Sequence, residues 1–320
     1  MPDSITHQFS LVNKSLKRAK NVLITSHENP DADAVGSLLA LNSAFLKLNI
    51  KSVCYLSDQP SPSLNFLPHF FDIKNSLDSM NFDLLFCLDY GDFKRLKLPN
   101  SFHKKPMITF DHHRGEQEGF VKIIRPDFSS TAELIYYFLK EAKIEIDKPI
   151  ATCLLAGIVS DTGIFSHIST SAQTMKVASD LLIKGAPLTK IIRQELIPRY
   201  GTLNNKIWGQ VLSRVKFEKQ KGLAYSSLTY ENLKEQSINS LNLTGVASTI
   251  STIFPANLSL FLVEYEKGKI RGSLRSEPFR GKRVDSIARI MGGGGHPYAA
   301  GFKCDGTIEE VLKKVQNLII

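Results

Sequence analysis

Short, almost continuously apolar runs recur along the first half of the chain, and three of them stop at histidine or aspartate. The runs cover residues 22–26, 52–56, 83–89, 107–110 and 120–124. Segments with apolar residues at helical spacing alternate with them, at 33–48, 129–139, 149–159 and 172–184. Strands that lack a polar face and alternate with helices predict a parallel sheet covered by helices on both faces.

The pattern changes after Gly185-Ala-Pro187. A helical connector is expected next, followed by hairpin-like segments with a turn at Lys267-Gly268 and by two helices, at 285–291 and 308–318. We therefore predict an α/β fold in which a smaller α/β domain follows the parallel-sheet domain. The predicted bounds are 1–187 for the first domain, 188–206 for the connector and 207–320 for the second domain.

Composition excludes several classes of protein. The 320 residues are 42% hydrophobic and 22% charged, which is ordinary for a globular chain. No apolar run reaches the length of about 18 residues that a membrane span needs, and the N-terminus lacks the features of a secretory signal. The cysteines are far apart and predict buried thiols in a reducing compartment: Cys54, Cys87, Cys153 and Cys304. We therefore expect a cytoplasmic protein with no membrane association.

Positive charge is concentrated in the last third of the chain. The formal net charge is +9, and residues 206–320 contain 17 Lys+Arg against 10 Asp+Glu. Residues 267–289 contain eight basic residues but only two acidic ones. Such a surplus suits an anionic partner, either a nucleotide or a short nucleic acid. A solvated basic face would give the same count, so the charge alone does not decide.

Acidic and histidine residues cluster where the predicted strands end. The stretches are 27–33, 89–92, 111–113 and, after an apolar helix, 160–163. Ligands of open parallel sheets bind beyond the carboxyl ends of the strands, so these four stretches are expected at one edge. A single aspartate at a strand end is usually a turn residue, but four such stretches at one edge favour a shared site.

Divalent cations would relieve the repulsion among these carboxylates. Carboxylate and imidazole ligands without thiolate favour Mn²⁺, with Mg²⁺ as an alternative. Six candidate ligands suit two ions, the arrangement that clamps the attacking and leaving oxygens of a displacement at phosphorus. Asp89 is the candidate bridging ligand, because it ends the most apolar predicted strand.

Two motifs resemble a known family. Asp111-His112-His113, together with His27-x-Asn-Pro-Asp31-x-Asp33, resembles the DHH phosphoesterase superfamily, and the segment Gly292–Gly301 resembles the glycine-rich signature of its DHHA1 domain. The resemblance covers essentially the whole chain, with the motifs in the expected order. The short two-domain form is similar to the nano-RNase and pAp phosphatase group, named bifunctional oligoribonuclease and PAP phosphatase. That resemblance implies hydrolysis of very short oligoribonucleotides and of 3′-phosphoadenosine 5′-phosphate (pAp).

The resemblance also implies residue roles in the first domain. One cation would be held by His27, Asp31 and Asp89, and the other by Asp33, Asp89, His112 and Asp161. His113 would contact the scissile phosphate as a catalytic residue, and Asp111 would orient a neighbouring ligand. The two cations would be Mn²⁺, with Mg²⁺ or Co²⁺ as alternatives.

The second domain is expected to bind the substrate. Arg275 resembles the family's arginine for the terminal phosphate of the nucleotide. Bare backbone at Gly293, Gly294 and Gly295 would let a phosphate or base approach closely, and His296 would donate to phosphate. A flexible linker is the alternative explanation of a glycine run taken alone. The expected partner is a nucleotide bisphosphate or a short single-stranded RNA.

Other functions remain open from the sequence. The same chemistry would serve a cyclic or linear dinucleotide phosphodiesterase, which a competition between the two substrates would separate. Inorganic pyrophosphatases share the first-domain motifs, but the segment around His296 argues against that class. A nucleotide sensor or RNA-binding module without catalysis would be favoured by a missing ligand, and every ligand position of the motif is filled. A homodimer through the first domain is compatible with the sequence.

Overall fold

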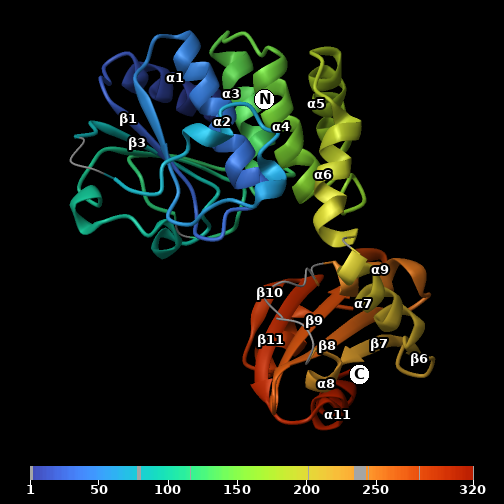
Figure 1. The fold of residues 1–320 in the computed structure, drawn as a ribbon. Coiled ribbons are helices and arrows are strands. Elements are labelled where there is room, and N and C mark those ends of the chain that lie inside the picture. The colour runs from blue at the N-terminus through green and yellow to red at the C-terminus, as the bar shows by residue number, and fades with distance from the viewer. Residues whose placement is uncertain are drawn as a thin grey trace. The chain divides into compact units, whose positions relative to one another are not determined.

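Two compact units make up the chain, Met1–Glu195 and Leu196–Ile320 (Figure 1). The structure, a computed structural model, describes residues 3–77, 81–115, 117–200, 202–233, 243, 245–280 and 282–319. Each unit has its own sheet and its own hydrophobic core. The predicted α/β fold, a parallel-sheet domain followed by a second sheet domain, is confirmed.

The first unit is built on a five-stranded parallel sheet with the order β2-β1-β3-β4-β5. The strands are β1 (Val22–Thr25), β2 (Ser52–Tyr55), β3 (Leu84–Leu88), β4 (Met107–Asp111) and β5 (Val121–Ile124). The central strand β3 is buried along its whole length. Because all strands run the same way, β1, β3 and β4 present their carboxyl ends at one edge of the sheet.

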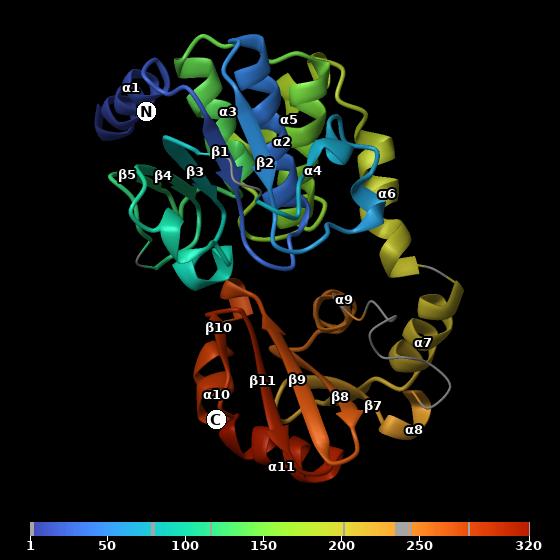
Figure 2. The same cartoon turned by 60° about the vertical axis from the view of Figure 1, so that its left-hand side comes forward.

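The two faces of this sheet are covered differently. Alternate residues of β3 separate, with Phe86 in the larger core and Leu85 and Cys87 in a smaller one, as the two-residue period of a strand requires. Helices pack on the larger core: α1 (Asp3–Leu16), α2 (Ala32–Lys47), α3 (Thr131–Glu141), α4 (Lys148–Asp161) and α5 (Ala172–Ile183) (Figure 2). The smaller core lies beneath short 3₁₀ helices at Phe93–Leu96 and Asn100–Phe102.

Helices α2 and α4 approach closely because glycines lie between them. A Cβ at Gly36 would stand 2.4 Å from the carbonyl oxygen of Cys153, and one at Gly157 would stand 2.5 Å from Oδ1 of Asp33. Any larger side chain at either position would push the helices apart. The pair of glycines therefore fixes where the N-terminus of α2, with Asp33, lies against α4.

The second unit contains a six-stranded sheet with the order β10-β11-β9-β8-β7-β6, in which only the pair β7–β8 is parallel among the described residues. The strands are β6 (Lys216–Glu218), β7 (Leu223–Leu228), β8 (Leu258–Glu266), β9 (Lys269–Ser276), β10 (Gly294–His296) and β11 (Ala299–Asp305). The long strands β8 and β9 form its centre.

Helices cover both faces of this second sheet. The helices α10 (Asp285–Ile290) and α11 (Ile308–Leu318) pack on one face. The other face carries α7 (Thr202–Ser213), α8 (Tyr230–Leu233) and α9 (Val246–Ile253), with Trp208 in the shared core. The helix α6 (Leu188–Tyr200) precedes α7 in the chain.

The structure also bears on the predicted absence of a membrane span and on the state of the cysteines. No helix within the described ranges has the length and apolar character needed to cross a membrane. All four cysteines are free thiols, buried at Cys54, Cys87 and Cys153 and partly buried at Cys304. Burial raises the pKa of Cys54, Cys87 and Cys153, so these thiols are unreactive packing groups.

Candidate functional site

Histidine and aspartate side chains gather beyond the carboxyl ends of three neighbouring strands. The chain leaves β1 towards His27, leaves β3 into Asp89, and ends β4 at Asp111. Two helices complete the group, since Asp33 lies in the first turn of α2 and Asp161 is the last residue of α4. The four stretches that the sequence predicted at one edge of the sheet thus meet in the folded unit.

One set of possible metal ligands is formed by His27, Asp31 and Asp89. Nε2 of His27 lies 3.9 Å from Oδ2 of Asp31 and 3.7 Å from Oδ2 of Asp89. His27 and Asp89 are buried, whereas the Asp31 side chain is half exposed. Nδ1 of His27 lies 2.7 Å from the carbonyl oxygen of Glu28, which suits a ring that donates there and keeps Nε2 for a cation.

A second set is formed by Asp33, His112 and Asp161. Nε2 of His112 lies 3.0 Å from Oδ2 of Asp161 and 3.4 Å from Oδ1 of Asp89. Despite these short distances, this buried nitrogen has no hydrogen bond with acceptable geometry in the described part of the chain. Asp89 therefore faces both sets, with Oδ2 towards His27 and Oδ1 towards His112.

The donor set fits divalent cations. An orphaned buried nitrogen among carboxylates is costly unless a cation occupies the space between them. Carboxylate oxygens and imidazole nitrogens without thiolate are the ligands of Mn²⁺ and related ions. A third combination, Asp89 with His112 and His113, also brings ligand atoms together, so His113 lies within the same cluster.

Backbone N–H groups and one hydroxyl hold the carboxylates in place. Asp33 accepts from the N–H of Thr131 at 2.7 Å and of Ala132 at 2.9 Å, both at the N-terminus of α3. Oγ1 of Thr131 donates to Oδ1 of Asp89 at 3.0 Å. Asp89 itself adopts φ 53°, the left-handed region that aspartate tolerates better than most residues. This strained backbone turns its carboxylate between the two ligand sets.

Asp111 is fully engaged with its neighbours. Its Oδ2 accepts from the N–H groups of Tyr90 and Gly91, at 3.0 and 2.8 Å. Its Oδ1 contacts both the N–H and Nδ1 of His113, at 2.8 and 2.9 Å. With both oxygens occupied, Asp111 orients His113 and the loop after β3. Asp111 thus orients His113, the residue that the sequence predicts to contact the scissile phosphate.

The electrostatics of the cluster follow from burial and crowding. Burial alone would raise the pKa of Asp89, but the close approach of the His112, His113 and His27 rings outweighs it and holds this pKa well below its usual range. Burial raises the pKa of Asp161 to about 6. Burial lowers the pKa of His113, yet its contacts with Asp111 and Asp89 prevail and raise it to about 10. His113 is thus an imidazolium near neutral pH.

The second unit places the predicted substrate residues on or next to β9 and β10, the two strands on either side of β11. His296 pairs with Ala299 across β10 and β11, and Ala299 pairs with Arg275 across β11 and β9. Directly paired residues of antiparallel strands point to the same face, so His296 and Arg275 share a face with a small alanine between them. Two strand spacings of about 4.8 Å separate their backbones by roughly 10 Å.

The Arg275 side chain is held by hydrogen bonds to a serine hydroxyl and a backbone carbonyl. Its Nε donates to Oγ of Ser248 at 3.1 Å, and its Nη1 donates to the carbonyl oxygen of Leu274 at 2.8 Å. Burial, aided by the nearby Arg271, lowers its pKa. No acidic side chain forms an ion pair with Arg275 within the described ranges. A partly buried guanidinium of this kind suits an anionic ligand.

The glycine run forms strand β10 together with the residues just before it, and it pairs with β11. This excludes a flexible linker as the explanation of the run. A Cβ at Gly293 would lie 2.1 Å from the carbonyl oxygen of Gly301, and one at Gly295 would lie 2.6 Å from that of Ala299. Both glycines let the run pack against β11. Gly294 has open space at the Cβ position, so of the three exposed glycines it is the one where a ligand could approach the backbone from the Cβ side.

Comparisons with known proteins follow the same division of the chain. Residues 21–158 match the model of the DHH family, N-terminal domain, and residues 219–320 match that of the DHHA1 domain. A bifunctional oligoribonuclease and PAP phosphatase NrnA of Thermus thermophilus is 30% identical over 318 residues, covering 96% of this chain and 93% of that protein. The chain belongs to the DHH phosphoesterase family. Membership makes it a metal-dependent hydrolase of phosphoesters.

Two further similar proteins align with almost the whole of this chain. A probable bifunctional oligoribonuclease and PAP phosphatase NrnA of Streptococcus mutans is 24% identical over 314 residues, covering 97% of this chain and 99% of that protein. The crystal structure of an exopolyphosphatase-related protein from Bacteroides fragilis is 27% identical, with a TM-score of 0.84 over 98% of this chain and 95% of that one.

Two residues of this DHH phosphoesterase's cluster were not predicted from the sequence. The sequence indicated only that Thr131 lies at the start of a helix. Its contact with Asp89 joins residues 42 positions apart in the chain. Arg95 lies in a polar stretch that carries no motif, yet its Nη2 is 3.0 Å from Nδ1 of His27. Both contacts arise from the folding of distant segments, so no local pattern could have marked them.

Proposed function

We propose that the chain uses two divalent cations, Mn²⁺ in the first place, to hydrolyse pAp and very short oligoribonucleotides. The observation that carries the proposal is the position of Asp89, whose two oxygens face two different ligand sets. A bridging carboxylate of this kind is what a pair of cations needs. Support for the substrates comes from the two nearly full-length relatives, each named as an oligoribonuclease and PAP phosphatase.

The assignment of ligands follows the two sets. His27, Asp31 and Asp89 would hold one cation, and Asp33, Asp89, His112 and Asp161 the other. Bound there, such cations supply Lewis acidity that makes water more acidic and neutralises charge on phosphoryl oxygens. The fixed carboxylates keep the ligand geometry, since Asp33 and Asp89 are both tied to the start of α3.

His113 has the properties of a phosphate contact. Asp111 fixes its ring through Nδ1, and its pKa of about 10 keeps it cationic at the working pH of most enzymes. A positioned cationic donor stabilises the negative charge that develops on phosphoryl oxygens during displacement. In this role His113 donates a hydrogen bond to the substrate and keeps its own proton.

The second unit would bind the part of the nucleotide that is not cleaved. Arg275 offers a guanidinium without an acidic partner in the described ranges, and His296 shares its face of the sheet. Gly294 presents backbone without a Cβ contact within 4 Å. Together these groups suit a terminal phosphate, which both pAp and a 5′-phosphorylated dinucleotide carry.

One assay panel tests the proposal. Purified protein with Mn²⁺ is given pAp, a linear ribodinucleotide, a short and a long RNA, a cyclic dinucleotide and pyrophosphate. Asp89→Asn is the matched control, because it preserves shape and removes the charge of the bridging carboxylate. We expect turnover of pAp and of the shortest RNAs, with a loss of at least a hundredfold in the variant.

The panel also separates the alternatives. Turnover of only the cyclic dinucleotide or only pyrophosphate would overturn the proposed substrates and keep the metal centre. Undiminished turnover by Asp89→Asn would overturn the assignment of Asp89 as the bridging ligand. Binding of pAp without turnover of any substrate would favour a nucleotide sensor.

A further inference from the structure

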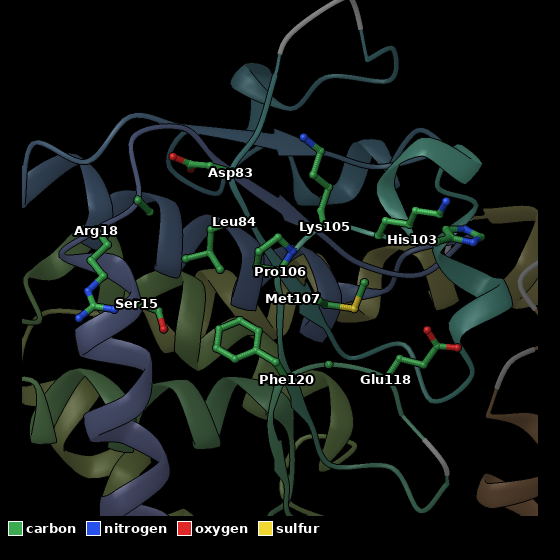
Figure 3. Close-up of a pocket in the computed structure, with 13 residues that line it drawn as sticks. Ser15, Arg18, Asp83, Leu84, His103, Lys105, Pro106, Met107, Glu118 and Phe120 are labelled. Carbon is green, nitrogen blue, oxygen red and sulfur yellow. The ribbon is translucent and has the colours of Figure 1, made fainter.

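A cavity of about 700 Å³ opens at the edge of the first unit's sheet opposite to the metal ligands (Figure 3). It lies at the amino ends of β3, β4 and β5: Leu84 and Met107 begin the first two strands, and Phe120 directly precedes the third. Since β3 spans five residues at about 3.3 Å each, the cavity lies about 15 Å or more from Asp89. A small ligand in it would not reach the metal centre.

The rim of the cavity offers cations without acidic partners. Arg18 and Lys104 line it, and neither forms an ion pair in the described part of the chain. Asp83 also lines it, but its two oxygens accept from the N–H groups of Lys20 and Asn21 at 2.8 and 3.0 Å. Its charge is therefore partly neutralised by the backbone. Glu118 is a second acidic residue of the lining, but Arg18, Lys104 and Lys105 outnumber the two carboxylates, which leaves the cavity attractive to an anion.

The floor of the cavity is apolar. Leu84 and Met107 are buried where they line it, and Phe120, also in the lining, is 58% exposed (Figure 3). Gly119 holds this wall close, because it adopts φ +137° and a Cβ there would lie 3.1 Å from the carbonyl oxygen of Met107. An exposed phenyl ring on an apolar floor suits the flat face of a nucleobase.

We propose that this cavity is a second nucleotide site, which binds a nucleoside monophosphate with its base on Phe120 and its phosphate at the basic rim. Cations surround an aromatic floor, and that pairing matches the two halves of such a ligand. The volume falls within the range of small-molecule sites. An acidic peptide would use the cations but leave the phenyl ring without a partner.

The cavity is connected to the metal centre by one buried side chain. Tyr90 follows Asp89 directly, and its hydroxyl contacts both the N–H and the carbonyl oxygen of Glu118 at 3.0 Å. Glu118 lines the cavity, and the N–H of Tyr90 donates to Asp111. A nucleotide that orders the wall at 118–120 would thus also order the loop after β3, which gives the site a regulatory role.

Binding of AMP to the full-length protein tests the site. AMP is titrated calorimetrically with Mn²⁺ and again with EDTA, so that any binding through the metal centre is removed in the second titration. We expect one AMP per chain to remain bound in EDTA. The double variant Arg18→Glu/Lys104→Glu should weaken this binding at least tenfold, and Phe120→Ala at least threefold. The control Lys51→Glu/Lys176→Glu makes the same charge change outside the cavity and should leave it unchanged.

Three results would overturn the proposal. One is the absence of an EDTA-resistant site. Another is EDTA-resistant binding that neither cavity variant weakens, which would place AMP elsewhere, for example in the second unit. The third is displacement of AMP by inorganic phosphate as readily as by AMP itself, with no effect of Phe120→Ala, which would show an anion site without a base. None of these depends on catalytic turnover.

Hydrogen exchange in EDTA tests the connection. AMP should slow amide exchange at 118–121 and also at Tyr90 and Gly91. Protection confined to the cavity wall would overturn the regulatory role.

Discussion

Nη2 of Arg95 lies 3.0 Å from Nδ1 of His27, and the same ring nitrogen lies 2.7 Å from the carbonyl oxygen of Glu28. A protonated Nδ1 donates to Glu28 and cannot accept from Arg95, whose guanidinium only donates. The Glu28 contact is the one a metal-binding histidine needs, because it leaves the lone pair of Nε2 facing Asp31 and Asp89. Arg95 is then a positive charge beside the ligand, anchored by its hydrogen bond to the carbonyl oxygen of Tyr90.

Removing the charge of Arg95 should impair catalysis more than folding. We expect Arg95→Gln to lower kcat/KM by about 10–100-fold, the usual effect of losing a group next to a metal ligand, with a small change in Tm. Arg193→Gln removes an exposed arginine elsewhere in the first unit and serves as the control. Kinetics at saturating Mn²⁺ check the expectation, and a variant with normal kcat/KM would show that Arg95 only braces the loop.

Thr131 is expected to matter through its hydroxyl. Thr131→Val keeps the shape of the side chain but leaves Oδ1 of Asp89 without its donor, at a cost of about 1–3 kcal/mol for a buried polar group. We expect weaker Mn²⁺ binding and lower kcat in Thr131→Val, and recovery of both in Thr131→Ser. Calorimetric titration of Mn²⁺ into the two variants measures the difference. Equal affinities would refute a role of the hydroxyl in holding Asp89.

Protons and cations should compete for the cluster. Burial raises the pKa of Asp161 to about 6, above its value in an unfolded chain, so the metal-free folded protein retains this proton as the pH rises. Its contribution to metal-free stability therefore falls between about pH 4 and pH 6. The pKa of His112 is also raised, since contacts with Asp161 and Asp89 outweigh burial. Binding of a cation must displace both protons.

The stabilisation by Mn²⁺ should consequently grow with pH. We expect the Tm difference between Mn²⁺ and EDTA to be larger at about pH 8 than at about pH 5.5, where Asp161 and His112 hold protons. Scanning calorimetry at the two pH values measures it, with Asp161→Asn as a variant in which the dependence should be reduced. A Tm difference that is constant over this range would contradict the proposed ligands.

The sequence was most informative where polarity changes abruptly. The runs that became β1, β3 and β4 are apolar up to the residue that leaves the strand, so His27, Asp89 and Asp111 could be expected at one edge. The parallel fold follows from the same pattern. The strand β10 could not be expected, because glycine has little preference for strands and its pairing depends on contacts with β11 that no local pattern reveals. The roles of Arg95 and Thr131 could not be predicted either, because each depends on a contact with a residue far away in the sequence.

The glycine run offers a matched pair of substitutions. Gly293→Ala would place a Cβ 2.1 Å from the carbonyl oxygen of Gly301, so β10 must move away from β11. Overpacking of this kind costs about 1–3 kcal/mol. Gly294→Ala meets nothing within 4 Å, so its stability should stay near that of the parent chain. Denaturant unfolding of the two variants measures the contrast.

The same pair distinguishes packing from ligand binding. If the backbone at Gly294 receives the phosphate of the nucleotide, the methyl group of Gly294→Ala should raise KM for pAp severalfold while kcat and stability stay nearly unchanged, because the metal ligands lie in the first unit. Gly293→Ala should raise KM as well, but only together with its loss of stability. An unchanged KM in a stable Gly294→Ala protein would remove this glycine from the proposed phosphate site.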